Sequence, residues 1–210
     1  MRLWYLHRAV PWTPLVGCLL GALAMSALTH RWPAAAGLGM PCVALLCAAA
    51  AGLVHDEPAA AVAAVTPRAG WAAGSRSSTA LLPLVVSLGL LVTLPARLHP
   101  DRGGMALVGT ATVLIALGAA TLAAAEQRPR PGGAVAAGVI LLGLSPLPVG
   151  ALLDVPELFP LGTFPDGLRT FWIVTAAVGL AACLVPVLRP SRVRRRTAPA
   201  RRPARRRPGR

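Results

Sequence analysis

The sequence contains no lysine and few acidic residues, with 7 Asp and Glu against 21 arginines in 210 residues. Only 13% of the residues are charged, whereas about a quarter are charged in a soluble globular domain. With 55% hydrophobic residues and a mean hydropathy of +0.63, the composition is typical of a polytopic membrane protein. We therefore expect an all-α fold, a bundle of transmembrane helices.

Acidic residues and histidines are absent from the long apolar runs. All seven acids and all four histidines lie at or beyond the ends of those runs. Because ionisable groups inside a membrane usually mark proton relays and ion sites, this absence argues against a proton-coupled carrier. The four cysteines lie inside apolar runs without CxxC or Cys/His metal spacing. We interpret them as small buried hydrophobic residues, and the sequence predicts no metal site.

Motifs of several enzyme classes are absent as well. The chain has no GxxxxGK[ST] phosphate loop, no HExxH and no GxSxG. Ser145 stands in an apolar run, but no histidine of the expected bundle could activate it as a nucleophile. We interpret it as a packing or kink residue. The sequence thus predicts neither an enzyme nor a cofactor.

Six apolar stretches are long enough to cross a bilayer core of about 30 Å, which needs about 20 helical residues. A cleaved signal peptide is the alternative for the first, because Ala22-Leu23-Ala24 resembles a cleavage site. The second is rich in Ala and Gly, so we expect it inside the bundle. Pro146 and Pro148 should bend or end the fifth. The expected transmembrane domain is 1–188, with spans at 9–29, 34–54, 79–96, 105–125, 134–153 and 168–188.

Arginines set the expected orientation. With six spans and an inside N-terminus, seventeen arginines lie on the inner side and four on the outer side. The positive-inside rule then favours both termini in the cytoplasm of a bacterium, with the chain crossing its inner membrane.

The last 22 residues, 189–210, hold eleven arginines and four prolines. We expect a disordered cytoplasmic tail, because like charges repel and prolines interrupt helices. Such a tail favours contact with anionic lipid headgroups, and the absence of interleaved aromatic residues argues against nucleic acid as a partner. The candidate lipid contacts are Arg194, Arg195, Arg196, Arg205, Arg206 and Arg207.

The polar stretch 55–78 is the longest polar break on the expected inner side. Its acidic start and the proline that follows predict a short helix, because helix N-termini favour acidic groups and tolerate proline. A basic and aromatic part follows. This stretch is either a solvated loop or a docking element for a soluble partner. The candidate docking residues are Asp56, Glu57, Pro58, Val62, Thr66, Pro67 and Trp71.

The segment between the fifth and sixth spans, 154–167, carries three acids, two Phe, three Pro and no Arg. It is too apolar for a hydrated loop and too interrupted by proline for a span. We expect it to re-enter the outer face of the membrane. The candidate re-entrant residues are Pro156, Leu158, Phe159, Pro160 and Phe164.

Six spans, an inner helical segment after the second and a half-buried outer segment before the sixth form a pattern that resembles the membrane subunits of ABC-2-type ABC transporters. The phrase HDEPAAAVAAVTP also resembles small actinobacterial integral membrane proteins encoded beside ABC ATPases. The resemblance implies a coupling helix at 56–70 that docks on the ATPase, and a re-entrant segment at 156–167.

It further implies a permease-like subunit that works as a homo- or hetero-oligomer with a separate ATPase and moves a lipid-like or drug-like molecule. A non-transporting membrane scaffold or accessory protein is the alternative function. A stand-alone secondary carrier is the third.

Overall fold

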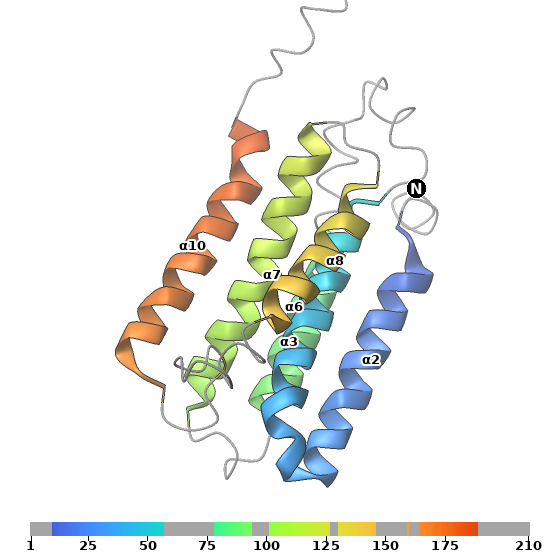
Figure 1. Ribbon diagram of the computed structural model, residues 1–210. Helices are drawn as coiled ribbons and strands as arrows, with labels where there is room; N and C mark the ends of the chain where they lie inside the picture. The colour runs from blue at the N-terminus through green and yellow to red at the C-terminus, as the bar shows by residue number, and fades with distance from the viewer. Residues whose placement is uncertain are drawn as a thin grey trace, which may run out of the picture.

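The computed structural model describes residues 10–56, 78–93, 101–126, 130–145, 159 and 164–188, without the side chains of residues 186 and 187. Every regular element within these ranges is helical, and no strand occurs there, which confirms the all-α class (Figure 1). The elements are α2 (Trp12–Arg31), the 3-10 turn η1 (Pro33–Ala35), α3 (Ala36–Leu53), α6 (Leu81–Val92), α7 (Arg102–Ala125), α8 (Pro131–Leu144) and α10 (Asp166–Leu188).

Four stretches are long and apolar enough to cross a membrane: α2, η1 with α3, α7 and α10. The other two helices, α6 and α8, have 12 and 14 residues. At 1.5 Å per residue each spans only about 20 Å, less than the bilayer core. Four helices are thus long and apolar enough for a multi-pass membrane protein, and the described helices within the other two expected spans are shorter. Helix α8 ends at Leu144, and Pro146, where the sequence predicts a disruption, lies outside the described residues.

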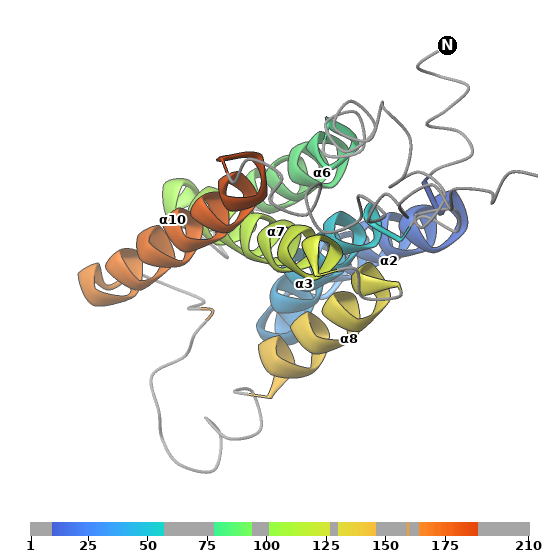
Figure 2. The same ribbon diagram turned by 90° about the horizontal axis from the view of Figure 1, so that it is seen from above.

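The centre of the bundle is α3, as its small residues predict. Fourteen of its 18 residues are buried, and it packs against α2, α6, α7 and α8 (Figure 2). Small side chains let these neighbours approach closely. A Cβ at Gly39 would collide with Thr29 of α2, and one at Gly143 of α8 would collide with Leu45 of α3.

The outermost helix is α10, whose main neighbour is α7 (Figure 2). The two backbones touch at a pair of glycines. A Cβ at Gly118 would lie 2.6 Å from the carbonyl oxygen of Gly179, and a Cβ at Gly179 would lie 2.6 Å from the amide nitrogen of Ile115. Only glycine permits this approach, so the contact is fixed by two positions in the sequence.

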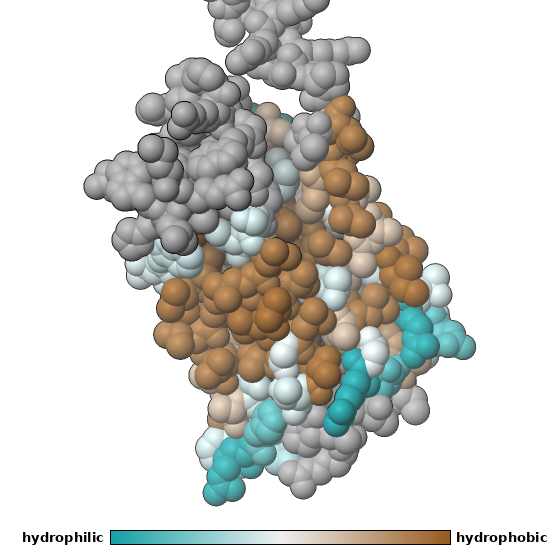
Figure 3. Space-filling view, turned by 180° about the vertical axis from the view of Figure 1, so that it is seen from behind, coloured by the Kyte–Doolittle hydropathy of each residue, from teal (hydrophilic) through white to brown (hydrophobic). Residues whose placement is uncertain are grey.

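Large apolar side chains cover the outside of the bundle. Figure 3 shows a hydrophobic band across the middle of one face and hydrophilic residues gathered at its lower end. A soluble monomer rarely exposes apolar patches beyond a few hundred Å², so this surface is suited to lipid. The most exposed large apolar residues are Leu142 (75%), Leu188 (73%), Leu141 (71%), Val85 (64%), Leu20 (61%) and Leu81 (60%).

The helices alternate in direction, so their ends form two groups (Figure 1). One group contains the start of α2, the end of α3, the end of α7, the start of α8 and the end of α10, and we call it the Asp56 end. The opposite group contains the starts of α7 and α10, and we call it the Asp101 end.

Candidate functional site

Asp56 joins two helices at the Asp56 end. Past Leu53 the chain turns once more, and the amide of Asp56 donates to the carbonyl of Leu53 at 3.0 Å. The carboxylate then points at the first turn of α8, where Oδ1 accepts from the amide of Gly132 at 2.6 Å and Oδ2 from the amide of Gly133 at 2.7 Å. These amides have no partner within their own helix, and the helix dipole adds attraction for a negative charge.

The start of α8 has the sequence that this contact needs. Arg130 precedes it in the left-handed region at φ 47° and caps no amide with its side chain, and Pro131 takes the first helical position. A Cβ at Gly132 would lie 2.5 Å from the carbonyl oxygen of Gly52 and 3.0 Å from Cγ of Asp56. Glycine at 132 therefore lets the first turn of α8 rest on the last turn of α3. We call Gly52, Asp56, Gly132 and Gly133 the α3–α8 corner.

His55 links the same turn to α7. Its side chain is only 7% exposed, and its Nε2 lies 3.4 Å from the hydroxyl oxygen of Thr121. The Thr121 hydroxyl donates to the carbonyl of Leu117 at 2.6 Å, so its oxygen can accept a hydrogen bond from the imidazole N–H. Thr121 precedes the end of α7 at Ala125 by four residues, which places the contact about 6 Å below that end.

The position of His55 corrects the expectation that no histidine lies in the bundle. The residue does fall at the end of an apolar run, but the end of α3 lies below the end of α7, so the side chain is enclosed. A buried ionisable residue in a membrane bundle is the usual indication of a functional site. Among the described residues, no group of three His, Cys, Asp or Glu could hold a metal ion.

Several polar side chains along the helices donate hydrogen bonds to backbone carbonyls, as packing residues do. The hydroxyl of Ser145 donates to the carbonyl of Leu142 at 2.9 Å, and those of Thr110, Thr112 and Thr175 donate to carbonyls of their own helices. Such bonds satisfy a hydroxyl in lipid without a partner helix. What the Asp56 end offers chemically is therefore a held carboxylate and an enclosed imidazole, rather than an activated nucleophile.

Of the predicted docking residues, Asp56 is the one that the structure describes. The sequence predicts that it starts a helix directly after itself, whereas the structure gives its carboxylate to α8. Asp56 is the first of the predicted docking residues and also part of the α3–α8 corner, so the polar stretch 55–78, which we call the docking stretch, starts at this corner. The others, Glu57, Pro58, Val62, Thr66, Pro67 and Trp71, lie outside the described residues.

The expected re-entrant segment is described at Phe159 and Phe164, and both rings are buried, at 7% and 9% exposure. Phe159 lies 5.6 Å from the ring of Trp172, centre to centre, in α10. The ring of Phe164 occupies the space left by Gly104, whose Cβ would lie 2.5 Å from it. Two helices are thus bridged by aromatic rings at the Asp101 end. Pro156, Leu158 and Pro160 lie outside the described residues, as do Arg194, Arg195, Arg196, Arg205, Arg206 and Arg207 of the tail.

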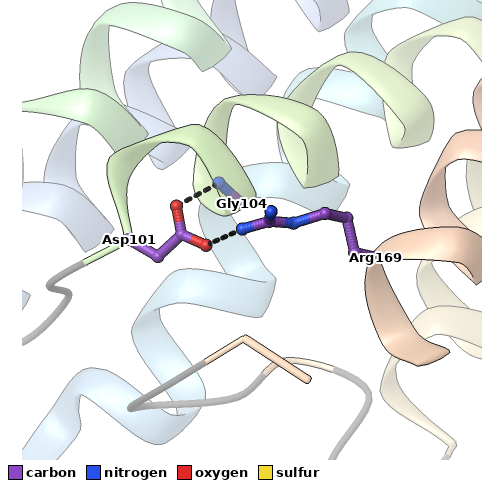
Figure 4. A network of polar contacts seen from close by, with 3 residues as sticks. All are labelled: Asp101, Gly104 and Arg169. Carbon is purple, nitrogen blue, oxygen red and sulfur yellow. Dashed lines mark hydrogen bonds and ion pairs between the residues drawn. The ribbon is translucent and has the colours of Figure 1, made fainter. Parts of the chain in front are cut away.

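At the same end, Asp101 forms an ion pair with Arg169 (Figure 4). Its Oδ1 caps α7 by accepting from the amide of Gly104 at 2.9 Å, and its Oδ2 accepts from Nη2 of Arg169 in α10 at 2.6 Å. The Gly104 amide lowers the pKa of the Asp101 carboxyl most, slight burial opposes it, and Arg169 lowers it further. No pattern in the sequence indicates this pairing, because the two partners are 68 residues apart.

Comparisons with protein-family models, with characterised proteins and with solved structures find no match for the chain. The ABC-2 resemblance therefore rests on the order of spans and segments in the sequence.

Proposed function

We propose that the chain is a membrane-spanning, permease-like subunit of an ABC-2-type transporter in a bacterial inner membrane. In this proposal it crosses the membrane six times, with both termini and the Asp56 end in the cytoplasm. The docking stretch after Asp56 contacts a separate ATPase, and the chain assembles as a homo- or hetero-oligomer. The non-transporting scaffold is the alternative.

The observation that carries the proposal is the junction of three helices at the point where the docking stretch begins. Asp56 binds the first turn of α8, and the neighbouring His55 contacts α7 from the end of α3. A partner that pulls or pushes on the stretch after Asp56 would act on three helices at once. A scaffold needs a binding surface only, whereas a transporter needs this mechanical connection to its helices.

Three further features agree with the proposed topology. The apolar sequence continues beyond the described ends of both short helices, to Ala96 after α6 and to Leu153 after α8. The Asp56 end, where the arginine-rich tail follows α10, would face the cytoplasm under the positive-inside rule. The two Phe residues buried at the Asp101 end lie in the segment expected to re-enter the outer face.

Val62→Asp tests the docking stretch. On the expected helix Val62 shares a face with Ala59 and Val65, whereas Ala64 lies about 200° away, so Ala64→Asp places the same charge on the opposite side. A charge buried at the interface costs about 3 kcal/mol, roughly a hundredfold in affinity. Purification from native membranes should therefore recover an ATPase with wild type and with Ala64→Asp, and lose it with Val62→Asp at equal abundance.

Deleting residues 189–210 should leave the ATPase bound, because six inner arginines remain to set orientation. If Val62→Asp keeps the ATPase and the tail deletion loses it, the scaffold alternative replaces the proposal. If the wild type recovers no ATPase, the permease assignment is wrong.

A further inference from the structure

The first turn of α8 is capped by a residue that is distant from it in the sequence. A helix is normally capped by the residue just before it, but here the residue before Pro131 is Arg130, and its side chain caps nothing. The two acceptor oxygens come from Asp56, 76 and 77 residues away in sequence. The first turn of α8 therefore depends on a residue that belongs to the end of α3.

At the α3–α8 corner the two helices cannot move closer without a clash, and they cannot move apart without losing these two hydrogen bonds. Gly132 rests on the backbone of α3, with its Cβ position 2.5 Å from the Gly52 oxygen and 2.9 Å from Cα of Leu53. The Cβ position of Gly133 is 3.2 Å from Oδ2 of Asp56. Both hydrogen bonds are short and involve a charged acceptor, which makes them about twice as strong as neutral ones.

Elsewhere α8 is less firmly held. Its main neighbour is α3, and Leu141 and Leu142 near its far end are more than 70% exposed. In a membrane, such lipid-facing side chains give little preference for one helix position over another, because lipid tails are as apolar as leucine. The position of α8 is thus set chiefly by α3, and at its first turn by Asp56.

We propose that Asp56 is a positioning residue that couples the docking stretch to α8. The chain leaves α3 at Asp56, so a displacement of the docking stretch reaches this residue first and is passed through its carboxylate to the amides of Gly132 and Gly133. This inference rests on the proposed function for its purpose, a partner acting on the stretch. The movement of α8 with the docking stretch, which the inference predicts, can be measured without any ATPase.

The first measurement is amide hydrogen exchange in lipid nanodiscs. Asp56→Asn keeps the shape of the side chain but replaces one acceptor oxygen with an NH₂ donor, so one of the two bonds is lost. Exchange in the first turn of α8 should rise about tenfold or more, while the first turn of α7 stays unchanged. Asp101→Asn is the matched control, because Asp101 caps α7 itself and should show the reverse pattern.

The second measurement perturbs the docking stretch by binding a protein to it. A short peptide epitope is inserted after Gly70, and a nanobody against it is added while exchange is followed at Gly132 and Gly133. Nanobody binding should change exchange there at least threefold in the otherwise unaltered chain and in Asp101→Asn, and leave it unchanged in Asp56→Asn. A residue that only stabilises the fold would not remove the response to the nanobody.

Gly133→Ala serves as a second variant if Asp56→Asn inserts poorly, since the added methyl group weakens the same link from the α8 side. It should also remove the nanobody response. The inference is overturned if the unaltered corner shows no response, or if Asp56→Asn or Gly133→Ala retains it. Failure of the wild type to recover an ATPase from native membranes would overturn the proposed function and leave these results standing.

Discussion

The contact between α7 and α10 gives a sharp prediction for Gly179→Ala. The new Cβ would lie 2.6 Å from the amide nitrogen of Ile115 and 2.6 Å from the carbonyl carbon of Leu114. Favourable contacts between such atoms need about 3.5 Å, so α10 must move away by roughly 1 Å. Both opposing atoms belong to the backbone of α7 and cannot turn aside as a side chain would.

The cost of such overpacking is about 1–3 kcal/mol. Gly138→Ala in α8 is the control, because nothing lies within 4 Å of its Cβ position. Both substitutions replace a helical glycine by alanine and gain the same helix propensity, up to about 1 kcal/mol. Their difference therefore isolates the contact with α7.

The assay is reversible unfolding by SDS in mixed micelles, followed by the loss of helical signal. Gly179→Ala should be less stable than Gly138→Ala by about 1–3 kcal/mol. If the two variants differ by less than about 0.5 kcal/mol, which is the usual spread of neutral surface changes, the close approach of α7 and α10 is refuted.

Two more predictions concern the Asp101 end. The pKa of Asp101 is lowered in the folded chain, so its contribution to stability is present at neutral pH and is lost as pH falls through that lowered value. Asp101→Asn should therefore lower the thermal unfolding midpoint at pH 7. If the difference in midpoint between wild type and Asp101→Asn fails to narrow toward pH 2, the pairing is contradicted. Phe164→Ala should cost about 3–5 kcal/mol in the SDS unfolding assay, because Phe164 is 9% exposed and packs on Gly104. Phe171→Ala should cost much less, because Phe171 is 47% exposed. Equal costs would show that Phe164 is not part of the core.

The sequence predicted much of the helical framework, because apolar runs and small residues report on single helices and on how closely they can pack. The Ala and Gly content of 34–54 correctly predicted a central α3. The sequence predicts that the fourth span starts at Met105, whereas α7 starts at Arg102 with Asp101 as its cap. Asp101 is a typical N-cap residue, but the Gly103-Gly104 pair that follows is a poor helix former and argues against a helix start there.

The Asp56 end was harder to predict, because its contacts join distant parts of the chain. The sequence predicts that Asp56 starts the helix next along the chain, which lies outside the described residues, whereas the structure shows its carboxylate bonded to the first turn of α8. The burial of His55 depends on the end of α7, 66 residues away. One signal was present in Pro131-Gly132-Gly133. The proline takes the first helical position, and the two glycines leave room for a capping side chain from a distant part of the chain.

The orientation of the bundle is the central claim, and paired topology reporters test it most directly. Reporters active only in the cytoplasm and only outside it are fused in turn after Gly70, after Arg210 and within residues 154–167. Our account predicts cytoplasmic signals at Gly70 and Arg210 and an external signal within 154–167. An external signal at Gly70 or at Arg210 would contradict it, because the docking stretch and the Asp56 end could then not meet a cytoplasmic ATPase.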